Sequence, residues 1–213
     1  MENDLDLREN ASHRLKELLA RHKFIFGDSV AHDEYSQALR TALEVINHEK
    51  INYEFDRPSK STSIIRGIIS SAEGARTGSD ASIFEFILKE LAEAEKREIM
   101  HHWLLRLYNY YKWECDDVDN DPYLKDINVA LDVVTERRTP TVDEIKSSAH
   151  RLKTLVNFFQ RMTSGEGSWE RLNDQTTPPK ACKKDFCPVL EFRKAFLEEI
   201  KMIVDLLHER IAG

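Results

Sequence analysis

The sequence predicts an all-α protein: a single helical bundle of about seven helices, with one long helix at its centre. Apolar residues recur at steps of three and four along most of the chain, and no two alternating segments are present that could pair as strands. Only 7 glycines and 6 prolines occur in 213 residues. A β-rich domain of this length would need more turn residues. We therefore expect one α-helical domain over residues 1–213, with a possible sub-bundle boundary near residues 116–122.

The first two predicted helices cover about residues 4–21 and 33–49. Each carries apolar residues on one face. Between them, the apolar residues 24–26 lead into Gly27-Asp28, a helix stop signal. The two helices are therefore expected to be separated by a short turn.

The next segment contains a linker, a loop and two further helices. Residues 51–55 alternate apolar and polar side chains, which predicts an extended linker, and residues 57–63 form a predicted polar loop. A third helix is expected over about residues 64–72. A long fourth helix reaches residue 113 from Asp80 or Ser82, roughly 45–50 Å. Its second half is apolar on nearly all sides, which is typical of a central helix.

Three more helices are expected in the C-terminal half, and the last two would join the long helix at the centre of the bundle. Helix five follows Pro122, helix six begins at Thr139-Pro140, and helix seven runs from Val189 to the C-terminus. Residues 163–188 form a long polar loop between the last two. The predicted seams of helices five and six alternate steps of three and four. Their members are Leu124, Ile127, Leu131 and Val134 in helix five and Val142, Ile145, Ala149, Leu152, Val156 and Phe159 in helix six.

Composition restricts the partners and the compartment. The net charge of −7 argues against broad nucleic-acid binding and against docking on anionic lipid. It does not argue against a local basic patch. The low, odd cysteine count (Cys115, Cys182 and Cys187) indicates a reducing compartment. The N-terminus lacks the features of a secretory signal, and no apolar run reaches the roughly 20 residues that span a bilayer. A cytoplasmic or nuclear protein without membrane association is expected.

An acidic loop precedes helix five. Asp117, Asp119 and Asp121 alternate in a pattern that resembles the start of an EF-hand calcium loop. However, Pro122 stands where that loop needs glycine, and Asn128 where it needs glutamate. The three aspartates are thus weak metal-ligand candidates. The alternative is a solvated loop in which Asp121 caps helix five.

Helix six carries a row of polar and basic residues opposite its apolar seam. This basic row comprises Lys146, His150, Lys153, Asn157 and Arg161. A positive face on an acidic protein predicts a partner-binding site, for which we select the four basic members. Lysines of the loop at residues 180–184 would extend it if the loop folded over. The alternative is a solvated face that Asp143, Glu144 and other acidic neighbours neutralise.

The five residues Ala149-His150-Arg151-Leu152-Lys153 also resemble the core motif of histidine-phosphotransfer domains. In that family an exposed bundle histidine accepts a phosphoryl group and a nearby lysine offsets its charge. The resemblance implies that role for His150, with Lys153 beside it. Thr154 departs from the pattern, because the family has glycine there.

Two groups of residues provide an enzymatic alternative. Arg8 and His13 have the spacing of HEPN-type helical ribonucleases, although this family carries the motif late in the domain. A cluster of His101, His102 and Arg106 in helix four is the other candidate; it lies in a segment expected to be buried. Glu98 and His101 also form an ExxH pair, but the second copy that a di-iron bundle requires is missing.

No phosphate-binding glycine loop, nucleophile elbow or dinucleotide fingerprint is present. The favoured function is therefore a non-enzymatic helical protein-interaction or regulatory module, an adaptor or a subunit of a larger assembly, without a cofactor. We expect a protein partner, and a homo-oligomer is the alternative assembly. The alternatives are a HEPN-like ribonuclease and a histidine-phosphotransfer-like signalling bundle.

Overall fold

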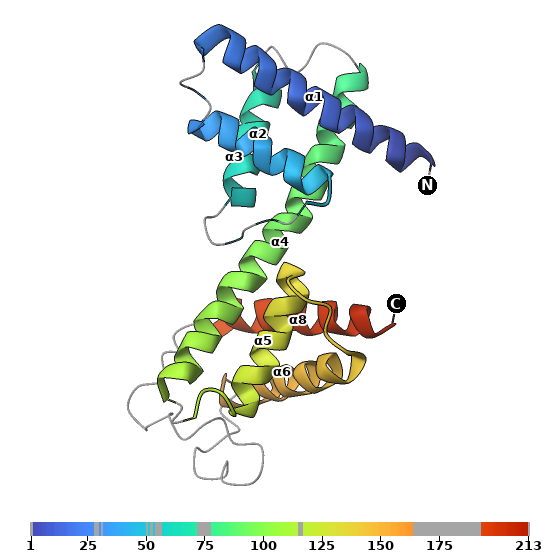
Figure 1. Cartoon of the computed structure of the whole chain (residues 1–213). Coiled ribbons are helices and arrows are strands. Elements are labelled where there is room, and N and C mark those ends of the chain that lie inside the picture. Colours follow the sequence, from blue (N-terminus) through green and yellow to red (C-terminus); the bar gives the residue numbers. More distant parts are fainter. Residues whose placement is uncertain are drawn as a thin grey trace. The chain divides into compact units, whose positions relative to one another are not determined.

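The computed structural model describes residues 2–27, 30, 32–49, 51, 53, 57–71, 78–114, 117–163 and 193–212. These residues contain seven α-helices and no strand, so the predicted all-α bundle is confirmed (Figure 1). The chain divides into two compact units, Met1–Glu98 and Ile99–Gly213. The division falls within α4 (Gly78–Glu114), and the possible sub-bundle boundary near residues 116–122 stays a prediction. The central position of this 37-residue helix stays a prediction.

Unit 1 contains α1 (Glu2–Phe26), α2 (Glu34–Ile46), α3 (Arg57–Ser70) and the part of α4 up to Glu98. Helix α2 contacts both α1 and α3 (Figure 1). Apolar side chains from all four helices form one buried cluster: Ala11, Leu15, Leu39, Ala42, Val45, Ile46, Ile65, Phe84, Phe86, Ile87, Leu91 and Ala94. In α1, α2 and α4 most of these residues are three or four positions apart, which places them on one face of the helix.

Helix α1 continues five residues beyond its predicted end near residue 21 and stops at Phe26. Gly27 follows with a φ of 81°, a conformation that glycine adopts without steric cost. Its N–H donates to the carbonyl of Lys23 at 2.8 Å, which closes the last turn. The stop signal was recognised correctly, but the apolar residues before it belong to the helix.

Helix α3 begins at Arg57, so the prediction of a polar loop over residues 57–63 was wrong. Two polar side chains of this segment, those of Ser61 and Thr62, are buried and form hydrogen bonds within the protein. The hydroxyl of Ser61 donates to the carbonyl of Ala38 at 2.6 Å, and that of Thr62 donates to the carbonyl of Pro58 at 3.1 Å. Serine and threonine, which are typical of loops, can therefore occupy buried positions in the first half of a helix when their hydroxyls find backbone acceptors.

Unit 2 contains the rest of α4 together with α5 (Pro122–Thr135), α6 (Val142–Thr163) and α8 (Arg193–Ala212). Helix α6 packs against α5 and α8. All four predicted seam residues of α5 are buried. In α6 the seam is confirmed at Ile145, Ala149, Leu152 and Val156, whereas Val142 is 49% exposed.

The remaining boundaries lie close to their predicted positions. Helix α2 is capped by Asp33, whose carboxylate accepts the N–H of Ser36 at 2.7 Å, and it ends at Ile46, a little earlier than expected. Residues 164–192 and most of the predicted linker at residues 51–55 lie outside the described part of the chain. None of the helices that are described is long and apolar enough to span a lipid bilayer.

Candidate functional site

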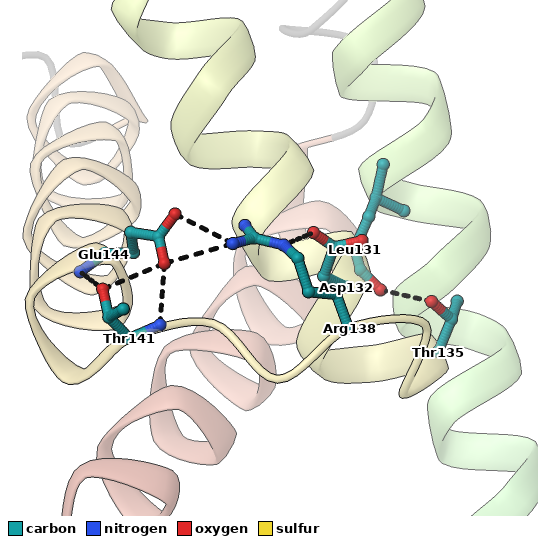
Figure 2. A network of polar contacts seen from close by, with 6 residues as sticks. All are labelled: Leu131, Asp132, Thr135, Arg138, Thr141 and Glu144. Carbon is teal, nitrogen blue, oxygen red and sulfur yellow. Dashed lines mark hydrogen bonds and ion pairs between the residues drawn. The ribbon is translucent and has the colours of Figure 1, made fainter.

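Helix α6, which carries the basic row, starts at a capping box. The N–H of Glu144 donates to the hydroxyl of Thr141 at 3.3 Å, and the Glu144 carboxylate accepts the N–H of Thr141 at 2.7 Å (Figure 2). This reciprocal pair satisfies two backbone N–H groups at the helix start. The predicted start at Thr139-Pro140 was therefore slightly early, because the Thr-x-x-Glu motif two residues later provides the cap.

Arg138 joins this cap to the preceding helix. Its Nε donates to Asp132 of α5 at 3.0 Å, and its terminal nitrogen donates to Glu144 at 3.0 Å (Figure 2). The N–H of Thr141 contributes most to lowering the pKa of Glu144, and Arg138 adds to the effect. The carboxylates of Asp132 and Glu144 in turn raise the pKa of Arg138. Glu144 is thus bound within the α5–α6 turn.

The buried seam of α6 leaves the basic row on the solvent side. Lys146, His150 and Lys153 are all exposed, in the order i, i+4 and i+7, so they extend about 10 Å along the helix axis. Within the part of the chain that the structure describes, none of the three forms an ion pair. Arg161 lies in the last turn of α6, but its side chain is outside the described set.

Two acidic residues near the row are paired with arginines outside it. Glu144 already pairs with Arg138, and Asp126 pairs with Arg151 on the flank of α6. Burial opposes the charged form of Arg151, but the hydrogen bond and the charge of Asp126 outweigh it and raise the pKa of the guanidinium. Asp143 is exposed in the first turn of α6. Whether Asp143 and other acidic neighbours neutralise the row stays a prediction.

The flanking Arg151 is a packing residue rather than a member of the site. Its guanidinium lies 4.5 Å from the ring centroid of Tyr123, which stacks on Tyr111 at 5.5 Å. The hydroxyl of Ser148 donates to the carbonyl of Asp126 at 2.7 Å in the same buried contact between α5 and α6. These contacts fix the rotation of α6 about its axis, and so determine which of its faces is exposed.

The three aspartates before α5 are involved in local turn structure. Asp121 is the N-cap of α5 and accepts the N–H of Leu124 at 2.9 Å, while Asp117 accepts from the side-chain amide of Asn120 at 3.0 Å. Asp119 is exposed. Among the described residues, no group of three potential ligands gathers to hold a metal ion.

Arg8 and His13 bind different partners in unit 1. The Arg8 guanidinium donates to the carbonyl of Ile46 at the end of α2 and to Glu90 of α4 at 3.0 Å. His13 is 76% exposed and lies 3.2 Å from Glu17 on the same helix. These contacts give Arg8 a structural role within unit 1.

The residues of the predicted α4 cluster and of the ExxH pair differ in their burial. Glu98 is 3% exposed and belongs to unit 1. In unit 2, His101 is 1% exposed, and its ring lies 5.8 Å from that of His102, which is partly buried. Arg106 is exposed and lies over the ring of Trp103 at 5.4 Å. His101 thus belongs to the packed interior rather than to an open site.

Sequence reasoning overlooked one surface feature, the exposed apolar residues at the end of α1. Phe24, Ile25 and Phe26 were assigned only to a helix stop. Their exposure could have been predicted from the run of three consecutive large apolar residues, because one face of a helix cannot bury all of them. Cys115, Cys182 and Cys187, and the loop lysines at residues 180–184, lie outside the described residues.

Comparison of the chain with known protein families, with curated proteins and with solved structures finds no match.

Proposed function

We propose that this protein is a non-enzymatic helical interaction module, a regulator, adaptor or subunit of a larger assembly, and that the basic row of α6 receives an acidic surface of a protein partner. The observation that carries the proposal is the exposure of Lys146, His150 and Lys153 on one face of α6 while the nearby Glu144 is bound by Arg138. A local positive surface on a chain of net charge −7 favours acidic surfaces and accelerates association with them.

The helix that carries the basic row is held firmly by its neighbours, which favours a recognition site over an unstructured charged surface. The seam of α6 is buried, its start is capped, and Arg151 joins it to Asp126 of α5. The three exposed side chains are thus presented at fixed spacing. When a partner with carboxylates at a matching spacing binds, the backbone of this surface would lose little conformational freedom.

A charge-reversal variant tests the proposal. Lys146→Glu with Lys153→Glu should fold normally, because both side chains are exposed. Native pull-downs with the full chain, quantified by mass spectrometry, should recover an acidic partner with the parent protein and at least about ten-fold less with the variant. The loss should be larger at low salt, where charges are screened less.

A matched control makes the same change of charge elsewhere. Lys112→Glu with Lys125→Glu alters two exposed lysines of unit 2 that lie on α4 and α5. This variant should retain the partner. Equal recovery by all three proteins, or a parent that recovers no partner and runs as a clean monomer, would count against the proposal.

A second candidate function uses the same exposed histidine. His150 is exposed and lies three residues before the exposed Lys153, as the resemblance to histidine-phosphotransfer domains requires. Incubation with phosphoramidate would transfer a phosphoryl group to the His150 ring nitrogen and release ammonia. An intact-mass gain of one phosphoryl group, lost in His150→Gln, would favour this function over the first.

A further inference from the structure

The basic row of α6 contains a side chain whose charge can change near neutral pH. Lysine keeps its positive charge throughout the physiological range, whereas histidine gains its charge as the pH falls from about 8 to about 5. His150 lies between Lys146 and Lys153, four residues after the first and three before the second. The positive charge of these three side chains therefore increases when the histidine ring takes up a proton.

The spacing of the three side chains brings them to the same strip of the helix surface. An α-helix turns by about 100° per residue, so the three lie within a sector about 60° wide. Residues three and four positions apart are neighbours on a helix, with about 5–6 Å between their Cβ atoms. A carboxylate that binds between Lys146 and Lys153 therefore lies beside the ring of His150.

The ring of His150 is accessible to water and to a partner. The residue is exposed, and within the described part of the chain it forms no ion pair. The hydroxyl of Thr154 donates to the carbonyl of His150 at 2.9 Å, a bond that involves the backbone and not the ring. The ring can therefore exchange its proton with solvent and contact an acidic group.

Four acidic residues lie on α5 and α6, and three of them are paired with arginines: Asp126, Asp132 and Glu144. The fourth, Asp143, is exposed on α6 seven residues before His150. The basic groups beside them include the exposed Lys125 of α5 and the partly buried Arg151 of α6. Asp143 is therefore the acidic residue of these two helices whose effect on the row needs a control.

Helix α8 also packs against α6. On this helix Glu198 is paired with Lys201, and Arg210 is paired with Glu136 of the α5–α6 turn. The other acidic and titratable side chains described on α8 are Glu199, Asp205, His208 and Glu209. His208 is exposed like His150, so it serves as a control for proton uptake away from the basic row.

We propose that His150 makes the binding of an acidic partner to the basic row depend on pH, with tighter binding at about pH 6 than at about pH 7.5. This inference rests on the proposed function, because it concerns the same surface. Partner carboxylates beside the ring favour its protonated form, and by linkage the protonated form binds the partner more tightly. The contact therefore strengthens in mildly acidic surroundings and weakens as the pH rises.

Fluorescence anisotropy of a labelled oligo-glutamate peptide with the full chain, at constant ionic strength, tests this regulation. The peptide stays ionised at both pH values, since glutamate has an ordinary pKa of about 4.3. The parent should bind it about two- to five-fold more tightly at the lower pH, the gain that one added exposed ion pair provides. His150→Gln should bind at both pH values as the parent does at the higher one. His150→Lys should bind at both as the parent does at the lower one.

Matched variants separate His150 from the other groups that titrate. His208→Gln should keep the full pH dependence, although it removes an exposed histidine from the same unit. Asp143→Asn should bind at least as tightly as the parent and keep the same ratio of affinities between the two pH values. An oligo-glutamine peptide of the same length should not bind. Far-UV circular dichroism should show the same helix content for every variant at both pH values.

The outcomes distinguish this inference from the proposed function. A pH dependence that persists in His150→Gln, or that disappears in His208→Gln, would assign the effect to other groups and overturn the inference. Equal affinity of the parent at both pH values would also overturn it. The proposed function would still stand in each case if Lys146→Glu with Lys153→Glu weakened binding. A charge-reversal variant that binds as tightly as the parent, or a parent that binds at neither pH, would overturn the inference and count against the proposed function.

Discussion

Glu98 accepts two hydrogen bonds from Ser59, one from the hydroxyl at 2.6 Å and one from the backbone N–H at 3.2 Å. Ser59 lies in the first turn of α3, and the Glu98 side chain on α4 is buried. A carboxylate at this position satisfies an N–H that has no partner within the helix and complements the helix dipole. The pair therefore links α3 to α4 within unit 1 and stabilises the start of α3.

Replacing Ser59 by alanine should destabilise unit 1 by about 1.5–3 kcal/mol, because a buried carboxylate loses a charge-assisted hydrogen bond. The loss should appear in denaturant unfolding followed by far-UV circular dichroism. All three tryptophans, at positions 103, 113 and 169, belong to unit 2, so their fluorescence reports separately on that unit. Ser63→Ala, which changes an exposed serine of the same helix, should alter stability by less than about 0.5 kcal/mol. Equal effects of the two substitutions would contradict a stabilising role of the Ser59–Glu98 hydrogen bonds.

Arg8 provides a second test in unit 1, and bears on the ribonuclease alternative. Its guanidinium bonds to Ile46 and Glu90 and lies over the ring of Phe86 at 5.5 Å. Arg8→Ala should therefore lower stability by about 2–3 kcal/mol. His13→Ala, at a 76% exposed position, should change it by less than about 0.5 kcal/mol. Cleavage of RNA by the parent, lost in both variants although both stay folded, would favour the enzymatic alternative.

The periodicity of apolar residues predicted the helical class and most of the core. Leu124, Ile127, Leu131 and Val134 are buried as their spacing required. The cap at Asp121 was also predictable, because an aspartate in front of proline satisfies the first turn of a helix. These features depend on residues close together in the sequence, and a single chain shows them directly.

Features that depend on distant residues were not predictable. The start of α3 depends on Glu98, which lies 39 residues after Ser59 in the chain, and no local pattern connects the two. The exposure of Lys146, His150 and Lys153 followed from the seam of α6. The pairing of the nearby Glu144 with Arg138, six residues earlier, was not predicted, and the three-dimensional structure shows it.

His48 adopts a left-handed conformation after α2, with a φ of 54°. A non-glycine residue is strained there, and its N–H closes the helix by donating to Val45 at 3.1 Å. His48→Gly should therefore stabilise unit 1 by about 0.5–1 kcal/mol, even after the larger chain entropy of unfolded glycine is included. The matched substitution Glu49→Gly, at a position without a positive φ, should destabilise it. Circular dichroism during urea unfolding measures both, and a lower midpoint for His48→Gly would show that the histidine side chain outweighs the backbone strain.

The capping box of α6 predicts a pH dependence of the stability of unit 2. The N–H of Thr141, followed by Arg138, lowers the pKa of Glu144 in the folded protein, below the value of about 4.3 that a glutamate has in an unfolded chain. As the pH falls toward that value, the unfolded state takes up the proton first. The stabilisation by ionised Glu144 is therefore complete above about pH 5 and is lost as the pH falls through the folded pKa.

Glu144→Gln should accordingly lower the thermal midpoint of unit 2 at pH 7, and the difference from the parent should shrink below about pH 4. Tryptophan fluorescence during heating measures the midpoint, because every tryptophan lies in unit 2. Asp205→Asn, at an exposed position of α8, should show little difference from the parent across the same range. A Glu144→Gln difference that stays constant from pH 7 to below pH 4 would mean that the ionised carboxylate is not what stabilises the α5–α6 turn.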